Sequence, residues 1–208
     1  MILQNYALLY ELNTVILFLI IIYFLFRMGF YKFMGIFIFL LCFLFHFFRV
    51  PKINNNLSNK YIYSPCYGTI KEIKKTDKYL QIAIFINVTD PHIQYIPYKG
   101  HIRKILYKKG EFNPAYIMKK GKYNEKMIYH IDTIKGNIIV SQIAGVLART
   151  IIPFVKEKQF VEQNEELGLI KLGSRCDIFI PIYNNMNILV KKGDYVNGTF
   201  TKLIEFLN

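Results

Sequence analysis

Two long apolar runs near the N-terminus constrain this chain more than any other feature. The first covers residues 15–26 and contains only apolar side chains and one tyrosine, and the second covers residues 33–48 and is interrupted only by His46. Each run is somewhat shorter than the about 20 residues that a straight helical crossing of a bilayer requires. We therefore expect residues 1–48 to form a membrane anchor of two short antiparallel helices, spanning or re-entrant, and we expect the protein to be located at a membrane.

The basic charge lies almost entirely in the remainder of the chain. The 208 residues carry a formal net charge of +13, whereas the first 48 residues contribute only Arg27, Lys32 and Glu11. A strongly basic domain can bind nucleic acid or the anionic face of a bilayer. The apolar runs favour the bilayer, and no zinc-finger, helix-turn-helix or aromatic RNA-binding motif supports nucleic acid. AT-rich coding, which enriches lysine, is an alternative explanation of the same charge.

The three cysteines indicate neither a disulfide scaffold nor a metal site. Cys42, Cys66 and Cys176 are odd in number and form no CxxC or Cys/His ligand spacing. A reducing compartment and no bound metal are therefore the simplest expectation.

Short segments rich in β-branched and aromatic residues follow a linker, rich in Asn and Lys, at residues 51–60. Turn residues such as Lys135, Gly136 and Asn137 separate these segments. The expected strands cover residues 61–63, 69–70, 80–88, 101–107, 127–134, 137–140, 178–182 and 188–190. This spacing predicts a compact, mostly antiparallel β domain over residues 49–208. Residues 141–150 fit either a short helix or a buried strand.

One glycine–serine pair in this domain has an unusual sequence context. Gly173 and Ser174 lie between two strand-like segments, where such a pair is most often a simple turn. The surrounding sequence GLIKLGSRCDIFIP, at residues 168–181, resembles the processing-site segment of short phosphatidylserine decarboxylases. In that family a Gly-Ser bond in a GxIxFGSRxD context is cut by the protein itself.

Five further segments resemble motifs of the same family and follow the family's order. They are FFRVP at residues 47–51, SPCYG at 64–68, DPHIQ at 90–94, NEK at 124–126 and QIAGVLAR at 142–149, which resemble the family's FFRDP, SPADG, DVHVN, NER and QIAGxxAR. The resemblance runs from about residue 30 to the C-terminus. Residues 190–198 also resemble the turn and strand segments of barrel-sandwich folds, so we expect a barrel-sandwich-like β domain.

The resemblance implies a pyruvoyl-dependent carboxy-lyase that converts phosphatidylserine to phosphatidylethanolamine. It implies self-cleavage between Gly173 and Ser174, which gives a two-chain form of residues 1–173 and 174–208 and turns Ser174 into the pyruvoyl cofactor. The Ser174 hydroxyl would attack the carbonyl of Gly173, where a residue without a Cβ best tolerates an unusual backbone. The pyruvoyl ketone would accept electrons when the substrate carboxylate leaves, as pyridoxal phosphate does in other enzymes.

Two further residues are candidates for roles in this reaction. The resemblance implies that His92 takes part in the chemistry, and an imidazole, which titrates near neutral pH, suits a proton donor. The alternative for His92 is a structural role in a tight Asp-Pro turn. Arg175, next to the pyruvoyl position, is a candidate to bind the carboxylate or phosphate of an anionic aminophospholipid. A salt bridge with Asp177 explains Arg175 equally well.

Two positions depart from the family's pattern. Tyr67 replaces the acidic residue of SPADG that helps to activate the serine, and a phenol with a pKa of about 10 cannot supply a carboxylate's charge at neutral pH. Tyr95 replaces a histidine or an arginine of other members. Three titratable residues that could compensate are His101, His130 and Asp132.

These departures leave three functions open. The first is a working lyase, the second is an uncleaved relative that binds anionic lipid or a partner at the membrane, and the third is a β scaffold with unrelated binding. Intact Gly173, Ser174 and His92 favour the first function, and Tyr67 favours the second. The lipid backbone, the membrane topology and the oligomeric state stay open.

Overall fold

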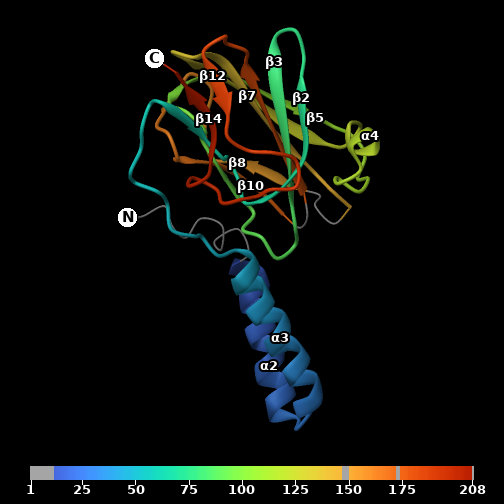
Figure 1. Ribbon diagram of the computed structural model, residues 1–208. Coiled ribbons are helices and arrows are strands. Elements are labelled where there is room, and N and C mark those ends of the chain that lie inside the picture. The colour runs from blue at the N-terminus through green and yellow to red at the C-terminus, as the bar shows by residue number, and fades with distance from the viewer. Residues whose placement is uncertain (1–11, 147–149, 172–173, 208) are drawn as a thin grey trace. The chain divides into compact units, whose positions relative to one another are not determined.

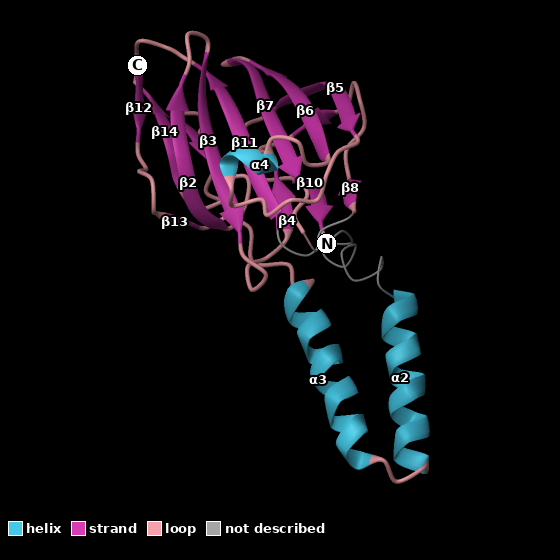
Figure 2. Cartoon of the chain, turned by 90° about the vertical axis from the view of Figure 1, so that its right-hand side faces the viewer, coloured by secondary structure: helices cyan, strands magenta, loops and turns pink. Residues whose placement is uncertain are grey.

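The apolar N-terminal runs form two helices in the computed structural model, which describes residues 12–146, 150–171 and 174–207. Helix α2 (Leu12–Arg27) and helix α3 (Tyr31–Phe47) are joined by a short turn in which Gly29 has a positive φ of 74°, a conformation that glycine tolerates best. The helices lie side by side, and the rings of Phe18 and Phe37 meet edge to face with centroids 5.6 Å apart (Figure 2). The two expected helices are therefore present.

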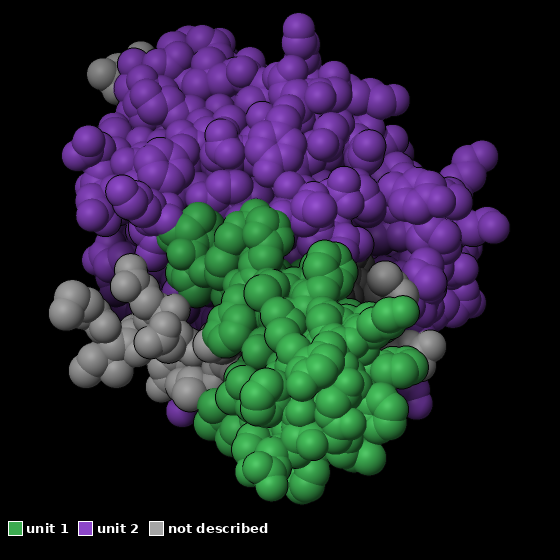
Figure 3. Space-filling view, turned by 90° about the horizontal axis from the view of Figure 1, so that it is seen from below, with its two compact units in different colours: residues 1–51 green, residues 52–208 purple. Residues whose placement is uncertain are grey.

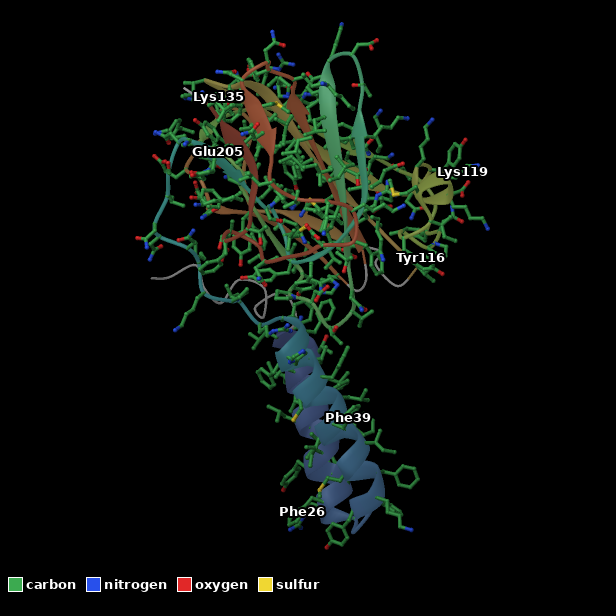
Figure 4. All side chains as sticks on the ribbon, viewed as in Figure 1. Phe26, Phe39, Tyr116, Lys119, Lys135 and Glu205 are labelled. Carbon is green, nitrogen blue, oxygen red and sulfur yellow. The ribbon has the colours of Figure 1, made fainter. Side chains whose placement is uncertain are left out.

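The helix pair exposes much of its apolar surface. Most of its large apolar side chains are exposed, and Phe39 reaches 70% exposure. Phe26 and Phe39 project outward from the helices (Figure 4). Over the residues that the structure describes, no helix combines the length and the apolar character needed to cross a membrane. Attachment of this segment to a membrane stays a prediction.

The chain divides into two compact units, Met1–Pro51 and Lys52–Asn208 (Figure 3). The second unit consists mainly of β-strands (Figure 1). Its largest sheet has eight strands in the order β13 (Tyr195–Val196), β2 (Gly68–Lys75), β3 (Tyr79–Ile86), β11 (Ser174–Pro181), β7 (Gly136–Ile143), β6 (Lys126–Thr133), β5 (Gly100–Lys108) and β9 (Phe160–Val161).

Two smaller sheets and one short helix complete this unit. The first small sheet has the order β1 (Tyr61–Tyr63), β14 (Lys202–Phe206) and β12 (Met186–Ile188), and the second has the order β4 (Ile93–Tyr95), β10 (Glu166–Ile170) and β8 (Ile151–Pro153). Helix α4 (Met118–Gly121) lies across one face of the large sheet (Figure 2). All the pairings between these strands are antiparallel.

The side chains of β11 alternate between the two faces of the large sheet, as the period of a strand requires. Cys176, Ile178 and Ile180 are fully buried in the hydrophobic core. The small sheets contribute to the same core through Ile170 and Ile204. The core therefore lies between the inner face of the large sheet and the two small sheets. The alternate side chains of β11, such as Arg175 and Asp177, point to the outer face of the large sheet.

The expected mainly β domain is confirmed, and most of its expected strands are present with slightly different bounds. Within residues 141–150, the first three end strand β7, so the buried-strand alternative is correct for them, and residues 147–149 lie outside the described residues. Six observed strands, β4, β8, β9, β10, β13 and β14, were not among the expected strands. They have only two to five residues, which is too few to give a clear alternating pattern.

Candidate functional site

Ser174 is the first residue of β11 and is fully buried. Its Oγ has no hydrogen-bond partner among the described residues. A buried hydroxyl without a partner costs about 1–3 kcal/mol, so such a group calls for an explanation beyond packing. Gly173, the other residue of the predicted cleavage site, lies outside the described residues.

His92 is buried beside the strand that precedes Ser174 in the chain. Its Nδ1 lies 2.6 Å from the carbonyl oxygen of Asp90. A carbonyl only accepts hydrogen bonds, so Nδ1 carries a proton and donates it to Asp90. The backbone N–H of Ile170, the last residue of β10, donates to the His92 carbonyl at 3.2 Å. This bond ties His92 to the chain that leads into Ser174.

Asp90 holds the turn that carries His92. Its Oδ1 accepts a hydrogen bond from the Tyr195 hydroxyl at 2.8 Å, and its Oδ2 accepts one from the backbone N–H of Asn87 at 2.8 Å. Both carboxylate oxygens are thus engaged, and the carboxylate is largely buried. The structure therefore gives Asp90 a positioning role for His92, through the carbonyl that Nδ1 contacts.

The segment Ser64–Gly68 contacts the first residues of β11 through Cys66 and Cys176. The thiol of Cys66 is fully buried, and its pKa is raised by burial and by the adjacent thiol of Cys176, which lies on the same face of β11 as Ser174. A Cβ on Gly68 would lie 2.2 Å from the carbonyl oxygen of Phe85, so only glycine permits this approach of the two backbones. The SPCYG and GSRCD motifs therefore meet in space.

Tyr67 and Tyr95, the two residues that depart from the family's pattern, also come together. Tyr95 is fully buried, and within the described part of the chain its hydroxyl has no hydrogen-bond partner. Burial raises the pKa of Tyr95, and the proximity of Tyr67 and Glu166 raises it further. The Tyr67 ring packs against Gly198, where an added Cβ would lie 2.8 Å from Cε2 of the ring.

Glu166 is a site residue that sequence reasoning missed. It pairs with Tyr95 between strands β10 and β4, and its Oε2 is buried without a hydrogen-bond partner among the described residues. Burial, and then the nearby charge of Glu165, raise the pKa of Glu166 from 4.5 to about 7. No motif includes Glu166, and only its position just before the apolar residues of the processing segment could have drawn attention to it.

A buried hydrogen-bond chain connects two of the sequence motifs. The Tyr129 hydroxyl donates to Oε1 of Gln142 at 2.6 Å, and Nε2 of Gln142 donates to Oε1 of Gln94 at 2.5 Å. Nε2 of Gln94 then donates to the His92 carbonyl at 2.7 Å. All four residues are almost fully buried. This chain fixes β4 and therefore the backbone of His92.

Arg175 lies on the other face of β11 from Ser174. Its Nε forms an ion pair with Oδ1 of Asp177 at 2.8 Å, and its Nη1 donates to the carbonyl of Ala115 at 3.2 Å. Burial raises the pKa of Asp177, and the Arg175 charge opposes that shift. The salt bridge that was the alternative explanation is present, and substrate binding by Arg175 stays a prediction.

The three titratable residues that could compensate for Tyr67 have their contacts on β5, β6, β7 and β9. His101 packs against the Phe160 ring, with 5.0 Å between centroids. His130 contacts Oδ1 of Asn137 at 3.1 Å through Nδ1. Asp132 accepts a hydrogen bond from Nδ2 of Asn137 at 2.7 Å. These contacts do not involve His92 or Tyr67, which lie in the loops just before β4 and β2.

The chain is similar to one family of known proteins over most of its length. The family model for phosphatidylserine decarboxylase matches residues 39–201. A protein of Methanosarcina barkeri, provisionally named an archaetidylserine decarboxylase proenzyme, is 37% identical over 150 residues, which cover 72% of this chain and 70% of that protein. The phosphatidylserine decarboxylase proenzyme of Streptomyces griseus is 33% identical over 158 residues, or 76% of this chain and 71% of that protein. The corresponding proenzyme of Carboxydothermus hydrogenoformans is 32% identical over 176 residues, or 81% and 82%.

The raised pKa of Glu166 predicts a pH dependence of stability. Because the folded pKa is about 7 and the ordinary value is 4.5, the folded state retains a proton that the unfolded chain releases. The resulting stabilisation is fully present below pH 4.5 and is lost as the pH rises through about 7. We expect Glu166→Gln to remove this fall in stability, as measured by thermal unfolding midpoints from pH 4.5 to 8. The exposed carboxylate Glu162, changed to Gln, serves as the control, and an unchanged profile in Glu166→Gln would contradict the assignment.

Proposed function

The chain belongs to the phosphatidylserine decarboxylase family, a family of carboxy-lyases, and from this premise we propose that it is a proenzyme that cuts itself before Ser174. The mature form then decarboxylates phosphatidylserine, or a lipid with the same seryl phosphate headgroup, to the corresponding ethanolamine lipid. One observation carries the proposal. The Ser174 hydroxyl is buried at the start of a strand with no hydrogen-bond partner among the described residues, as a nucleophile poised toward its own backbone would be.

Self-cleavage needs only groups of this chain and water. The Ser174 Oγ attacks the preceding carbonyl, and the peptide bond is replaced by an ester. β-Elimination breaks the bond between Cβ and Oγ, frees Gly173 as a carboxylate and leaves a dehydroalanine at the new N-terminus. Water then hydrolyses this dehydroalanine to a pyruvoyl group and ammonia. The buried, unpaired side chain fits this product, because the Ser174 oxygen leaves with the Gly173 carboxylate and no hydroxyl donor without a partner is left behind. Once formed, the pyruvoyl group supplies a ketone that takes up electrons when the substrate carboxylate leaves as carbon dioxide.

His92 is the residue to which we assign proton transfer. Its Nδ1 is held by the Asp90 carbonyl at 2.6 Å, so Nε2 is the atom that gives or accepts a proton. Two partners fix its backbone, since Ile170 and Gln94 both donate to its carbonyl. The turn that holds its ring is fixed as well, because Asp90 accepts a hydrogen bond from Tyr195. A proton donor held in this way loses little entropy in reaching the reacting atom.

Glu166 is a candidate for the carboxylate that Tyr67 does not supply. It lies beside Tyr95, and Tyr95 is in turn close to Tyr67. With a pKa of about 7, Glu166 is partly ionised at neutral pH and can accept a proton, whereas a tyrosine with an unperturbed pKa of about 10 is almost wholly protonated. The alternative function is that of an uncleaved relative that binds anionic lipid or a partner at the membrane, and the absence of a carboxylate at Tyr67 favours it.

We also propose that residues 1–48 attach the protein to a membrane. The support is the exposed apolar surface of α2 and α3, since exposed patches of this kind mark membrane or partner contacts. The strongly basic remainder of the chain adds attraction to anionic lipids, of roughly 1 kcal/mol for each basic residue near the surface.

Self-cleavage predicts a defined product. In the detergent-solubilised full chain, intact-mass spectrometry should detect a fragment of residues 174–208 with a pyruvoyl N-terminus. Ser174→Ala should give only the full-length chain, because it removes the attacking oxygen. Ser141→Ala, which changes another buried serine, should cleave like the parent. A parent protein that stays intact under all conditions would rule out self-processing.

Restoring a carboxylate at residue 67 should speed the cleavage. A carboxylate near the attacking serine can raise the pKa of a neighbouring base and strengthen it. Loss of the Tyr67 ring from Gly198 costs about 3–5 kcal/mol if the site does not collapse, so the folding of Tyr67→Asp must be verified. A time course of fragment formation is the measurement, with Tyr67→Phe as the control that keeps the ring. If folded Tyr67→Asp cleaves more slowly than the parent, Tyr67 is an adapted part of the machinery.

Membrane attachment through the helices predicts resistance to salt. Apolar contacts persist at high ionic strength, whereas attraction between exposed charges is screened. Membranes from expressing cells should therefore retain the protein in 1 M salt and release it in a neutral detergent. Release by salt alone would assign attachment to the basic surface instead of to the helix pair.

A further inference from the structure

A groove of about 630 Å³ lies on the outer face of the large sheet, the face opposite to the Ser174 side chain. Helix α4 lies over the sheet (Figure 2), and Met118, Lys119 and Lys122, on this helix and just after it, line one side of the groove. This side of the groove is fastened to the sheet, because Arg175 Nη1 bonds to the Ala115 carbonyl and the Tyr116 ring meets Phe85 edge to face at 5.8 Å. The volume falls within the range of about 300–1,000 Å³ that is usual for ligand sites.

Basic side chains from five segments line this groove. They are Lys74 on β2, Lys108 on β5, Lys119 on α4, Lys122, Lys126 on β6 and Arg175 on β11. The two acidic residues in the lining are Glu72 and Asp177, and Asp177 is already paired with Arg175 at 2.8 Å. The groove therefore presents a strong excess of positive charge.

Lys126 lies where this charge is most crowded. It is partly buried, and its Nζ donates to the carbonyl of Lys122 at 2.7 Å. Its pKa is lowered first by burial and then by the charge of Arg175, with Lys108 and Lys122 adding to the shift, whereas Asp177 opposes it. A bound anion would relieve this repulsion. Phosphate, which accepts several charge-assisted hydrogen bonds, suits such a cluster.

The floor of the groove is apolar and partly exposed. It is formed by Leu106, Ile128, Ile139 and Phe179, which are half-buried on β5, β6, β7 and β11. A small ion would leave this surface in contact with water, whereas a hydrocarbon chain would cover it. An occupant with a phosphate group and a hydrocarbon part matches both the basic rim and the apolar floor.

We propose that this groove binds one anionic phospholipid molecule, with its phosphate among the lysines and its hydrocarbon on the floor. The site is separate from the predicted reaction site, because Ser174 and Arg175 are successive residues of one strand and their side chains lie on opposite faces of the sheet. Binding there does not require cleavage of the chain, so the inference does not depend on the proposed function.

Native mass spectrometry in a neutral detergent tests the proposal, because it counts the lipid molecules that the protein retains. The full chain with Ser174→Ala is used, so that no cleavage takes place, and the probe is dihexanoyl phosphatidylglycerol. We expect one retained molecule, and at least tenfold weaker retention of dihexanoyl phosphatidylcholine and of glycerol 3-phosphate. The double variant Lys119→Glu/Lys122→Glu should weaken retention of phosphatidylglycerol at least tenfold, and Ile139→Thr should weaken it several-fold.

A matched control separates the groove from the general charge of the protein. Lys191→Glu/Lys192→Glu makes the same change of charge at an exposed turn outside the groove and should retain the lipid like the parent. Equal losses in the two double variants would overturn the proposal, as would the absence of any retained lipid. Equally strong retention of glycerol 3-phosphate would reduce the groove to a simple phosphate site, and equally strong retention of phosphatidylcholine would exclude recognition of net charge. Both results contradict the proposal.

Discussion

The pairing of β11 with β3 and β7 is the constraint on which the rest of the β unit depends. This pairing sets Ser174 opposite Ile86 and Cys176 opposite Gln142. The face of β11 that carries Ser174 and Cys176 therefore points into the core from the first residue of the strand. A shift of register by one residue would turn Ser174 to the outer face and Arg175 into the core. Such a shift would also turn two buried side chains of β11 (Ile178 and Ile180) out of the core that they share with four on β3 (Leu80, Ile82, Ile84 and Ile86), and their burial therefore opposes it.

A second level of organisation comes from polar groups inside this apolar frame. Gln94 and Gln142 have no charge, yet their hydrogen bonds join β7 of the large sheet to β4 of a small sheet. A Cβ on Gly168 would lie 3.0 Å from Nε2 of Gln142, so β10 also approaches this pair closely. Buried amides that satisfy one another specify a single arrangement of strands, whereas apolar contacts alone tolerate several. His92 takes its position from this arrangement.

The sequence proposes candidate site residues but not the contacts that surround them. The β class and the long strands follow from segments with clear alternation, and the resemblance brings Ser174, His92 and Tyr67 to attention. The short strands β4 and β10 are not predictable from the sequence, because their extended conformation depends on their pairing with each other and not on a local pattern. Glu166 escaped notice for the same reason. Its raised pKa comes from burial opposite Tyr95, and no local pattern encodes that contact.

The two faces of β11 also change the interpretation of the net charge. A charge of +13 by itself indicates only attraction to an anionic surface or polymer. Here Lys108, Lys122 and Lys126 gather around a concave, partly apolar surface, and burial and the neighbouring positive charges lower the pKa of Lys126. Lysines on a flat surface would separate and stay hydrated at no such cost. The crowding of these positive charges around a concave surface therefore favours a local anionic ligand. Part of the net charge is better assigned to this one binding groove than to the surface as a whole.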